Sequence, residues 1–271
     1  KYKEFFDLLY KNLKKKKNIK KYKIKNNYFF NSIINEKDNY DLVINFDIKN
    51  IISKKFFFKR YEKDYKTSAF TSLIKHDECN NKTARQIFTK FGPLAFLPCS
   101  NQKTSIVFSI LDQNKIISDK KIQELILNYN NKYKIKKFEK FEKFKIKNSI
   151  LKKYYHKKIL CFGDNLHKIH PLAGQGLNMT IRDIKILSNI IDFRINLGLQ
   201  LDSAILKEFQ NKSKHYNYIF STAIDFIHDF FKYDNKFNNL YSKKLFNFLE
   251  TNNIFKKYSK KFADKGIFIN Y

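Results

Sequence analysis

Residues 157–191 constrain the fold of this chain more than any other stretch. They begin with a short apolar run, Ile159–Phe162, which predicts a buried strand. The next two residues, Gly163 and Asp164, end that strand with a turn and a carboxylate. A loop with one proline and two glycines follows, and from about Leu177 the apolar residues recur at helical spacing. The stretch therefore predicts a strand, an acidic turn, a glycine loop and a helix in that order.

This order predicts a binding site for a polar ligand. Glycines let backbone N–H groups come close to a ligand. The first turn of a helix offers N–H groups without intrahelical partners, and its dipole favours negative charge. The apolar face that should pack against the core comprises Leu177, Ile181, Ile184, Ser188 and Ile191.

The stretch 163–183, GDNLHKIHPLAGQGLNMTIRD, resembles the second flavin motif of the class A FAD-dependent aromatic monooxygenases, roughly GDAAHxxxPxxGQGxNxGxxD. Within that family it is most similar to the ubiquinone-biosynthesis hydroxylases of the UbiH/UbiF/UbiI group, the 2-polyprenylphenol hydroxylases. The matching positions are Gly163, Asp164, His167, Pro171, Gly174, Gln175, Gly176, Asn178 and Asp183.

Residues 41–55, DLVINFDIKNIISKK, resemble the family segment DLLVGADGxxSxVR less closely. Asp47 matches the family acid, which makes it a second candidate for cofactor binding. Asn45 and Ile48 replace two glycines, and a β-branched residue restricts φ and adds bulk. Residues 41–47 predict a buried strand that ends in an acid, and a plain core strand ending at a turn, without a cofactor role, is an equal alternative for this segment.

Residues 84–110 resemble the family block AxxxFxxxGPLAxLPL…SIVW of the substrate domain. The region 56–110 has the β-rich, partly alternating pattern of an antiparallel sheet. The resemblance implies that Ala95, Phe96 and Leu97 line the site of an aromatic substrate. Ordinary core packing is the alternative for each of them.

The resemblance implies a mixed α/β (α+β) chain with a PHBH-like FAD/NAD(P)-binding fold. We expect that fold to be incomplete at the N-terminus, because no GxGxxG fingerprint occurs. The expected domains are 1–55 and 157–195 for FAD binding, 56–156 for the β-sheet substrate domain, and 196–271 for C-terminal helices. Further expected elements are an amphipathic helix at 1–16, strands at 22–25 and 28–34, a helix at 119–133, a strand or helix at 134–146, and helices at 201–214, 216–232, 240–249 and 254–260.

The activity implied is hydroxylation of a polyprenylated phenol by O2 in ubiquinone biosynthesis, through a hydroperoxide at C4a of FAD. NAD(P)H or another electron donor would be the reductant. Asp164 would bind the ribityl chain, and His170 would line the site or be a loop histidine without a role. The other expected FAD contacts are Gly163, Pro171, Gly174, Gln175, Gly176, Leu177 and Asn178. A truncated or drifted non-catalytic homologue, kept as a subunit of a biosynthetic complex, is the alternative.

A formal net charge of +30 raises nucleic-acid binding or an anionic membrane surface as rival partners. The lysines are spread along the chain, and Lys, Asn, Ile, Phe and Tyr are abundant together, so we attribute most of the charge to compositional drift. We expect no nucleic-acid partner, a cytoplasmic protein that contacts the inner membrane peripherally, and free thiols at its three cysteines. Asp164, His167 and His170 could be a metal set, but Pro171 and the glycine loop argue against a helix there, and no third strong ligand is fixed by spacing, so we expect no metal.

Overall fold

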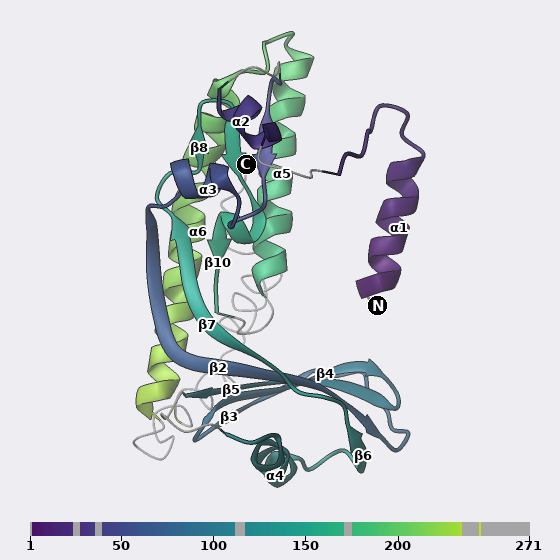
Figure 1. Ribbon diagram of the computed structural model, residues 1–271. Helices are drawn as coiled ribbons and strands as arrows, with labels where there is room; N and C mark the ends of the chain where they lie inside the picture. Colours follow the sequence, from purple (N-terminus) through teal and green to yellow (C-terminus); the bar gives the residue numbers. More distant parts are fainter. Residues whose placement is uncertain are drawn as a thin grey trace.

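A computed structural model describes residues 2–23, 28–35, 40–111, 117–170, 175–234 and 244. One sheet lies above the other along the long axis of the molecule, and two long strands, β2 (Arg60–His76) and β7 (Glu142–Leu151), run between the two parts (Figure 1). These two strands pair antiparallel and run from the upper part of the molecule into the lower sheet.

The upper sheet has three strands in the order β1-β9-β8. The predicted strand at 159–162 is confirmed as β9 (Ile159–Cys161), which is completely buried. Its parallel neighbour β1 (Val43–Asn45) is shorter than the predicted 41–47, and Ile44 within it is exposed. β8 (Tyr155–His156) pairs antiparallel with β9.

The lower sheet is antiparallel, as the sequence predicts for 56–110. Its order is β10-β7-β2-β5-β4-β3, and β6 also pairs with β2. The open alternative at 134–146 is decided in favour of strands, since most of it lies in β6 and β7. The remaining bounds are β3 (Arg85–Thr89), β4 (Gly92–Ser100), β5 (Lys103–Leu111), β6 (Ile135–Phe138) and β10 (His167–Lys168).

The helices differ from the predicted ones in two places. Residues 28–34 form a helix, α2, rather than a strand, because Ile33 and its apolar neighbours pack as one turn against the upper core. The two helices predicted between 201 and 232 are one helix, α6, since no glycine or proline interrupts them. The bounds are α1 (Tyr2–Lys14), α2 (Tyr28–Ile34), α3 (Ile51–Phe56), α4 (Asp119–Tyr129), the 3-10 turn η1 (Gly163–Asn165), α5 (Gln175–Asn196) and α6 (Ser203–Asp234). The helices predicted at 240–249 and 254–260 lie outside the described residues, apart from residue 244.

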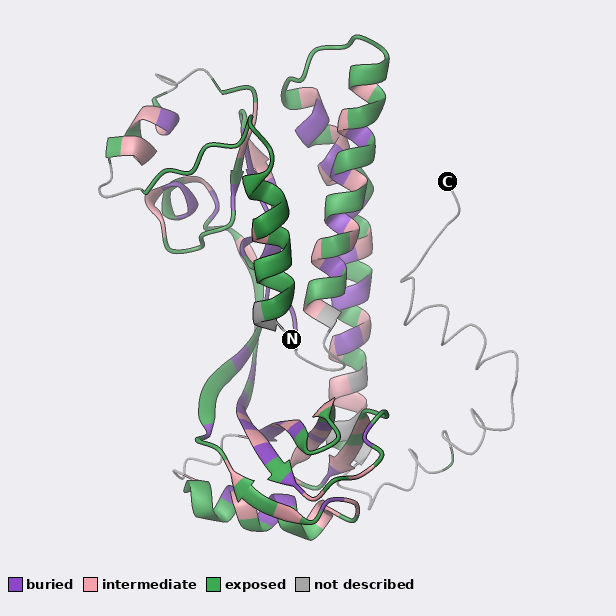
Figure 2. Ribbon diagram, turned by 90° about the vertical axis from the view of Figure 1, so that its right-hand side faces the viewer, coloured by how far each residue is buried: buried purple, intermediate pink, exposed green. Residues whose placement is uncertain are grey.

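The face of α5 that the spacing predicts as buried is the wrong one. Leu177, Ile181 and Ile184 are about half exposed, at 48%, 52% and 50%. The buried residues are Met179, Asp183, Leu187 and Ile190. α5 has apolar residues on more than one side, so periodicity could not identify the inner face. The inner face also contains Asp183, and a charged residue normally indicates an exposed face. From 216 to 232, Ile219 and Phe226 are exposed, whereas Phe220 and Ile224 are buried. Buried and exposed residues thus both occur along the long helices (Figure 2).

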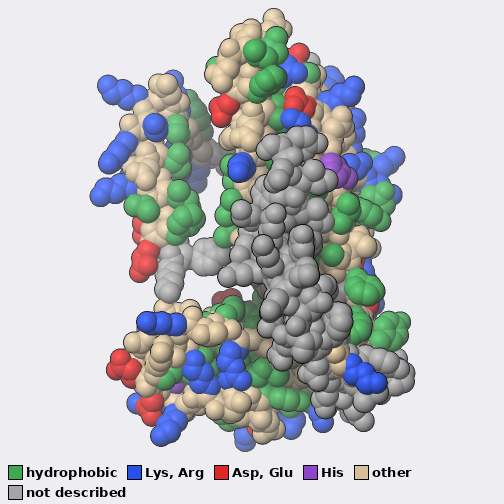
Figure 3. All heavy atoms as spheres, turned by 180° about the vertical axis from the view of Figure 1, so that it is seen from behind, with side chains coloured by type: hydrophobic (Ala, Val, Ile, Leu, Met, Phe, Trp, Pro, Cys, Tyr) green, Lys and Arg blue, Asp and Glu red, His purple; other side chains and the backbone are tan. Residues whose placement is uncertain are grey.

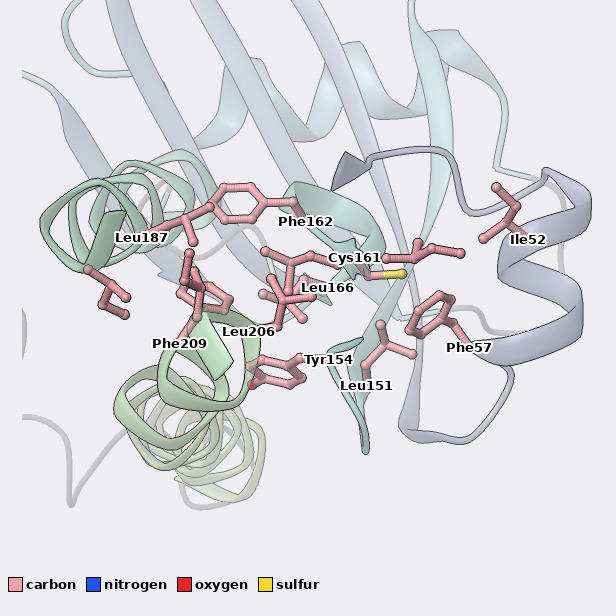
Figure 4. Close-up of a cluster of buried hydrophobic side chains, with 14 of the residues drawn as sticks. Ile52, Phe57, Leu151, Tyr154, Cys161, Phe162, Leu166, Leu187, Leu206 and Phe209 are labelled. Carbon is pink, nitrogen blue, oxygen red and sulfur yellow. The ribbon is translucent and has the colours of Figure 1, made fainter. Parts of the chain in front are cut away.

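Two apolar cores hold the molecule together. The upper core packs β9 and the end of β7 between α3 on one side and α5 and α6 on the other, with Phe162 and Phe209 stacked at its centre (Figure 4). The lower core lies between the sheet and α4, where Ile122, Leu125 and Ile126 are buried as predicted. The upper core therefore fixes the strand end and the helix from which the ligand site is expected.

Lysine and arginine side chains are scattered over the visible face of the molecule rather than gathered in one stripe (Figure 3). All three cysteines are free, as predicted, and Cys161 is buried. Among the helices that the structure describes, none combines the length and the apolar character that crossing a membrane requires.

Candidate functional site

Two aspartates follow adjacent parallel strands at the same edge of the upper sheet. Asp47 comes two residues after β1, and Asp164 comes three residues after β9. The strand ends are joined because the N–H of Phe162 donates to the carbonyl of Asn45 at 3.1 Å. The carboxyl ends of parallel strands are where ligands bind in sheets of this kind.

A buried polar network fixes the turn that carries Asp164. The Asn165 side-chain amide donates to the Asn45 carbonyl at 3.2 Å and to the Ser53 hydroxyl at 3.0 Å. Arg60 donates to the Asn165 carbonyl at 2.8 Å and to its side-chain oxygen at 2.7 Å. Asn165 is completely buried, so its position is strongly determined. The network ties the two strand ends to β2 and holds the residue next to Asp164.

Asp164 itself points outward. It is exposed, and its carboxylate has no hydrogen bond or ion pair with any residue that the structure describes. Gly163 before it has a φ of +61°, and a Cβ there would lie 3.2 Å from a ring carbon of Phe46. Both facts explain why glycine precedes the acid, since the turn needs a left-handed backbone in a crowded place. The result is a fixed carboxylate that is available to a ligand.

Asp47 is engaged in its own turn. Its carboxylate accepts from the Lys49 N–H at 2.7 Å, and its carbonyl accepts from the Ser53 hydroxyl at 2.6 Å. Asn50 caps α3 by accepting from the Ser53 N–H at 2.9 Å. Ile48 is 44% exposed and has no left-handed backbone, so it fits without the glycine of the family segment. Turn formation accounts for the Asp47 carboxylate without a ligand.

The turn η1 contacts α5, the helix that begins at Gln175. Its first turn contains no acidic residue, Asn178 is exposed, and a Cβ on Gly176 would meet nothing within 4 Å. The free N–H groups and the dipole of this 22-residue helix are therefore not neutralised from within. Pro171 and Gly174 lie outside the described residues, as does the side chain of Gln175.

The residues present fit a flavin. An exposed carboxylate can accept hydrogen bonds from the hydroxyls of a ribityl chain. A helix N-terminus without acidic residues stabilises negative charge by about 0.3–2 kcal/mol, which suits the N1–O2 side of a reduced flavin. Asp164 and the Gly176–Asn178 segment supply these two features on contacting elements.

Two further residues of the motif have a structural role. His167 on β10 donates from Nε2 to the Asp183 carboxylate at 2.6 Å, and both side chains are buried. Asn217 on α6 adds a longer bond of 3.4 Å to each Asp183 oxygen. The pair ties β10 to α5 on either side of the glycine loop, which explains why the motif contains a histidine and a distant aspartate.

The residues predicted to line a substrate site lie on both faces of β4. Phe96 is 1% exposed and packs in the lower core against Tyr133, on the side of α4. Ala95 and Leu97 face the other side of the sheet, where Leu97 is 40% exposed. The structure therefore brings Ala95 and Leu97 together on one face and leaves Phe96 beneath them.

His170 is buried, and its neighbours were missed by sequence reasoning. Burial, followed by the nearby His228, lowers the pKa of His170 to about 3. The rings of Tyr65 and His228 contact it, and Tyr65 donates to Asp225. Tyr65 and Asp225 alone are 160 positions apart, and no local pattern could have connected these residues. Within the described part of the chain, no group of three or more His, Cys, Asp or Glu side chains could hold a metal ion.

Comparison with known proteins agrees with this geometry. The chain is 22% identical over 215 residues to the ubiquinone biosynthesis monooxygenase COQ6 of Caenorhabditis elegans, a match that covers 63% of this chain and 48% of the relative. It is 25% identical over 157 residues to the ubiquinone hydroxylase UbiM of Neisseria meningitidis, which covers 55% of this chain and 34% of that protein. The chain thus spans about half or less of the length of these curated relatives.

Solved structures share the fold. A variant of HpxO from Klebsiella pneumoniae, complexed with FAD, aligns with a TM-score of 0.60 and 13% identity over 75% of this chain and 56% of its own. PqsL of Pseudomonas aeruginosa, a probable FAD-dependent monooxygenase, aligns with a TM-score of 0.55 and 16% identity over 74% of this chain and 59% of its own. Residues 60–196, half of the chain, match the model of the FAD binding domain family. The strand end, the acidic turn and the helix of the site fall within that match, and the chain belongs to the FAD binding domain family.

Proposed function

We propose that this chain forms part of an FAD-dependent aromatic hydroxylase that acts on a polyprenylated phenol in ubiquinone biosynthesis. One observation carries the proposal. The Asp164 carboxylate, which has no partner among the described residues, lies on a turn that contacts α5, and the first turn of α5 has no acidic residue. The resemblance of residues 163–183 to the flavin motif and the printed names of COQ6 and UbiM support the substrate class.

Each residue then has a definable task. Asp164 accepts hydrogen bonds from the ribityl hydroxyls, and the backbone of Gly176–Asn178 stabilises negative charge on the ring system. Bound FAD supplies the activation of O2, with NAD(P)H or another donor as reductant. His170, with Ala95 and Leu97, lines the side on which the phenol is held. Pro171, Gly174 and Gln175 keep the contacts that the motif implies.

A membrane face is the second part of the proposal. A polyprenyl chain is insoluble in water, so a phenol that carries one resides in a bilayer. α1 exposes Phe5, Leu9 and Leu13, at 46–56%, and its other side carries lysines that would be attracted to anionic lipid. We therefore propose peripheral contact with a membrane and with the other enzymes of the pathway.

A non-catalytic homologue is the second candidate. It is favoured by Asn45 and Ile48, which stand where the family segment has glycines, and by the engagement of Asp47 in its own turn. Such a protein would keep the fold and serve as a subunit of a biosynthetic complex.

The two candidates are separated by adding FAD to the purified chain and recording its visible spectrum. We expect bound FAD with shifted absorption maxima and quenched fluorescence. The bound FAD is then photoreduced and mixed with O2 and a short-chain prenylphenol, which bypasses the natural electron donor. A hydroxylated phenol supports the enzyme. Hydrogen peroxide without a hydroxylated product, or the absence of FAD binding by the folded chain, contradicts the enzyme and supports the non-catalytic homologue.

A further inference from the structure

A second polar cluster lies where β2, β7 and α6 meet the residue that precedes the glycine loop. Three rings touch pairwise, with centroid distances of 4.8 Å for Tyr65–His170, 4.7 Å for Tyr65–His228 and 5.0 Å for His170–His228. The Tyr65 ring stands edge-on to His170, at an interplanar angle of 82°. A strand and a helix thus close around His170 from two sides.

Tyr65 is anchored by a carboxylate. Its hydroxyl donates to Asp225 on α6, and Asn148 on β7 donates to the two oxygens of Asp225 at 3.2 and 3.3 Å. Tyr65 is 3% exposed, Asn148 is 7% exposed and the Asp225 side chain is 21% exposed, so these charge-assisted bonds form largely out of contact with water, which strengthens them. Burial and the bond to Asp225 raise the pKa of Tyr65, which keeps its hydroxyl a donor. The ring cannot leave His170 without breaking this anchor.

The backbone of β2 is distorted at the same place. The pairing of β2 with β7 shifts register between Asp64 and Thr67, and Lys66 has a φ of +53°. The Asp64 carboxylate supports this turn by accepting from the Lys66 N–H at 2.9 Å. A positive φ at lysine is strained, and bulges often redirect a side chain beside a functional site. The strain occurs directly next to Tyr65, whose side chain faces inward.

We propose that Asp225 is a positioning residue, which acts through Tyr65 to hold the His170 ring in one uncharged orientation beside the substrate. This inference rests on the proposed function and extends it to the recognition of the phenol. A neutral imidazole has one N–H donor and one acceptor lone pair, so it can orient a phenol hydroxyl either way, whereas an imidazolium can only donate. The Tyr65 and His228 rings both pack against the His170 ring. Lys63 and Asp229, which pair at 2.7 Å, are the charged groups at the rim.

The test follows the His170 ring by NMR titration in the flavin-free chain. In the wild type we expect it to titrate near pH 3. Tyr65→Phe removes only the anchoring hydroxyl, whereas Asp225→Ala removes its acceptor together with the partner of Asn148 and Lys63. Each variant should raise the pKa of His170 toward its ordinary value near 6.5 as water reaches the ring. The double variant should match the single ones, because both break the same link. Glu208→Ala on the same helix removes a carboxylate that pairs with Lys212 instead, and should leave the titration unchanged.

Unchanged titration in both single variants would overturn the proposal, and additive shifts would show that Asp225 does not act through Tyr65. If the wild type binds FAD, each variant should bind FAD as the wild type does but should bind a short-chain prenylphenol about tenfold more weakly. A wild type that binds no FAD but keeps the His170 titration pattern would remove the proposed function alone. The two failures are therefore distinguishable.

Discussion

Breaking the His167–Asp183 pair tests whether half of the flavin motif is structural. Asp183→Ala leaves the His167 ring buried, with its Nε2 donor unpaired, and removes an acceptor of Asn217. Truncating one partner of a buried pair of this kind costs about 3–5 kcal/mol. At an m-value of about 2 kcal/mol per M, the urea midpoint should fall by roughly 2 M.

The assay is urea unfolding followed by far-ultraviolet circular dichroism at neutral pH. Asp192→Ala is the matched control, because Asp192 lies on the same helix and is exposed, and it should change the unfolding free energy by no more than about 0.5 kcal/mol. The FAD affinity of the folded Asp183→Ala protein should change far less than its stability. A loss of less than about 1 kcal/mol would refute the structural role of this pair.

Three further predictions follow from buried groups. Asn165→Ala should lower the unfolding free energy by about 2–4 kcal/mol in the same assay, because Arg60 loses its side-chain acceptor while the Asn45 carbonyl and the Ser53 hydroxyl lose their amide donor; a change below about 1 kcal/mol would contradict this. Burial raises the pKa of Cys161 to about 12, so a thiol reagent at pH 8 should modify two cysteines in the folded chain and the third only after denaturant is added; three equally fast thiols would exclude this. Burial lowers the pKa of His170 to about 3, so the unfolded chain binds an extra proton between about pH 6.5 and 3. The unfolding free energy should therefore decrease as the pH is lowered through that range, and should decrease less in His170→Gln. Identical pH profiles for the two proteins would contradict the assignment.

The sequence predicted what depends on local pattern. The buried strand β9, the acidic turn and the start of α5 follow from an apolar run, a glycine and a change of period, and the structure has all three. The antiparallel sheet was predictable for the same reason. Segments with ambiguous pattern were not, and residues 28–34 became a helix only because the upper core receives its apolar side chains.

The inner faces of α5 and α6 could not be predicted, because burial there depends on long-range polar pairing. Asp183 can be buried because it accepts a hydrogen bond from His167. Asn217 can be buried because it accepts a hydrogen bond from Arg182 and donates one to Asp183. The cluster around His170 was invisible for a related reason, since its members come from β2, β7 and α6. Only the fold brings such residues together. The residues assigned to FAD from the motif remain predictions that ligand binding must test.

The most direct test of the flavin site is the FAD affinity of Asp164→Ala measured beside that of Asp192→Ala. Asp164 is exposed and its carboxylate bonds to none of the described residues, so its removal should leave the unfolding free energy within about 0.5 kcal/mol of the wild type. Losing hydrogen bonds to a charged group should weaken FAD binding by about 10–100-fold, while Asp192→Ala binds as the wild type does. Equal FAD affinities for the two variants would contradict the assignment of Asp164 to the flavin.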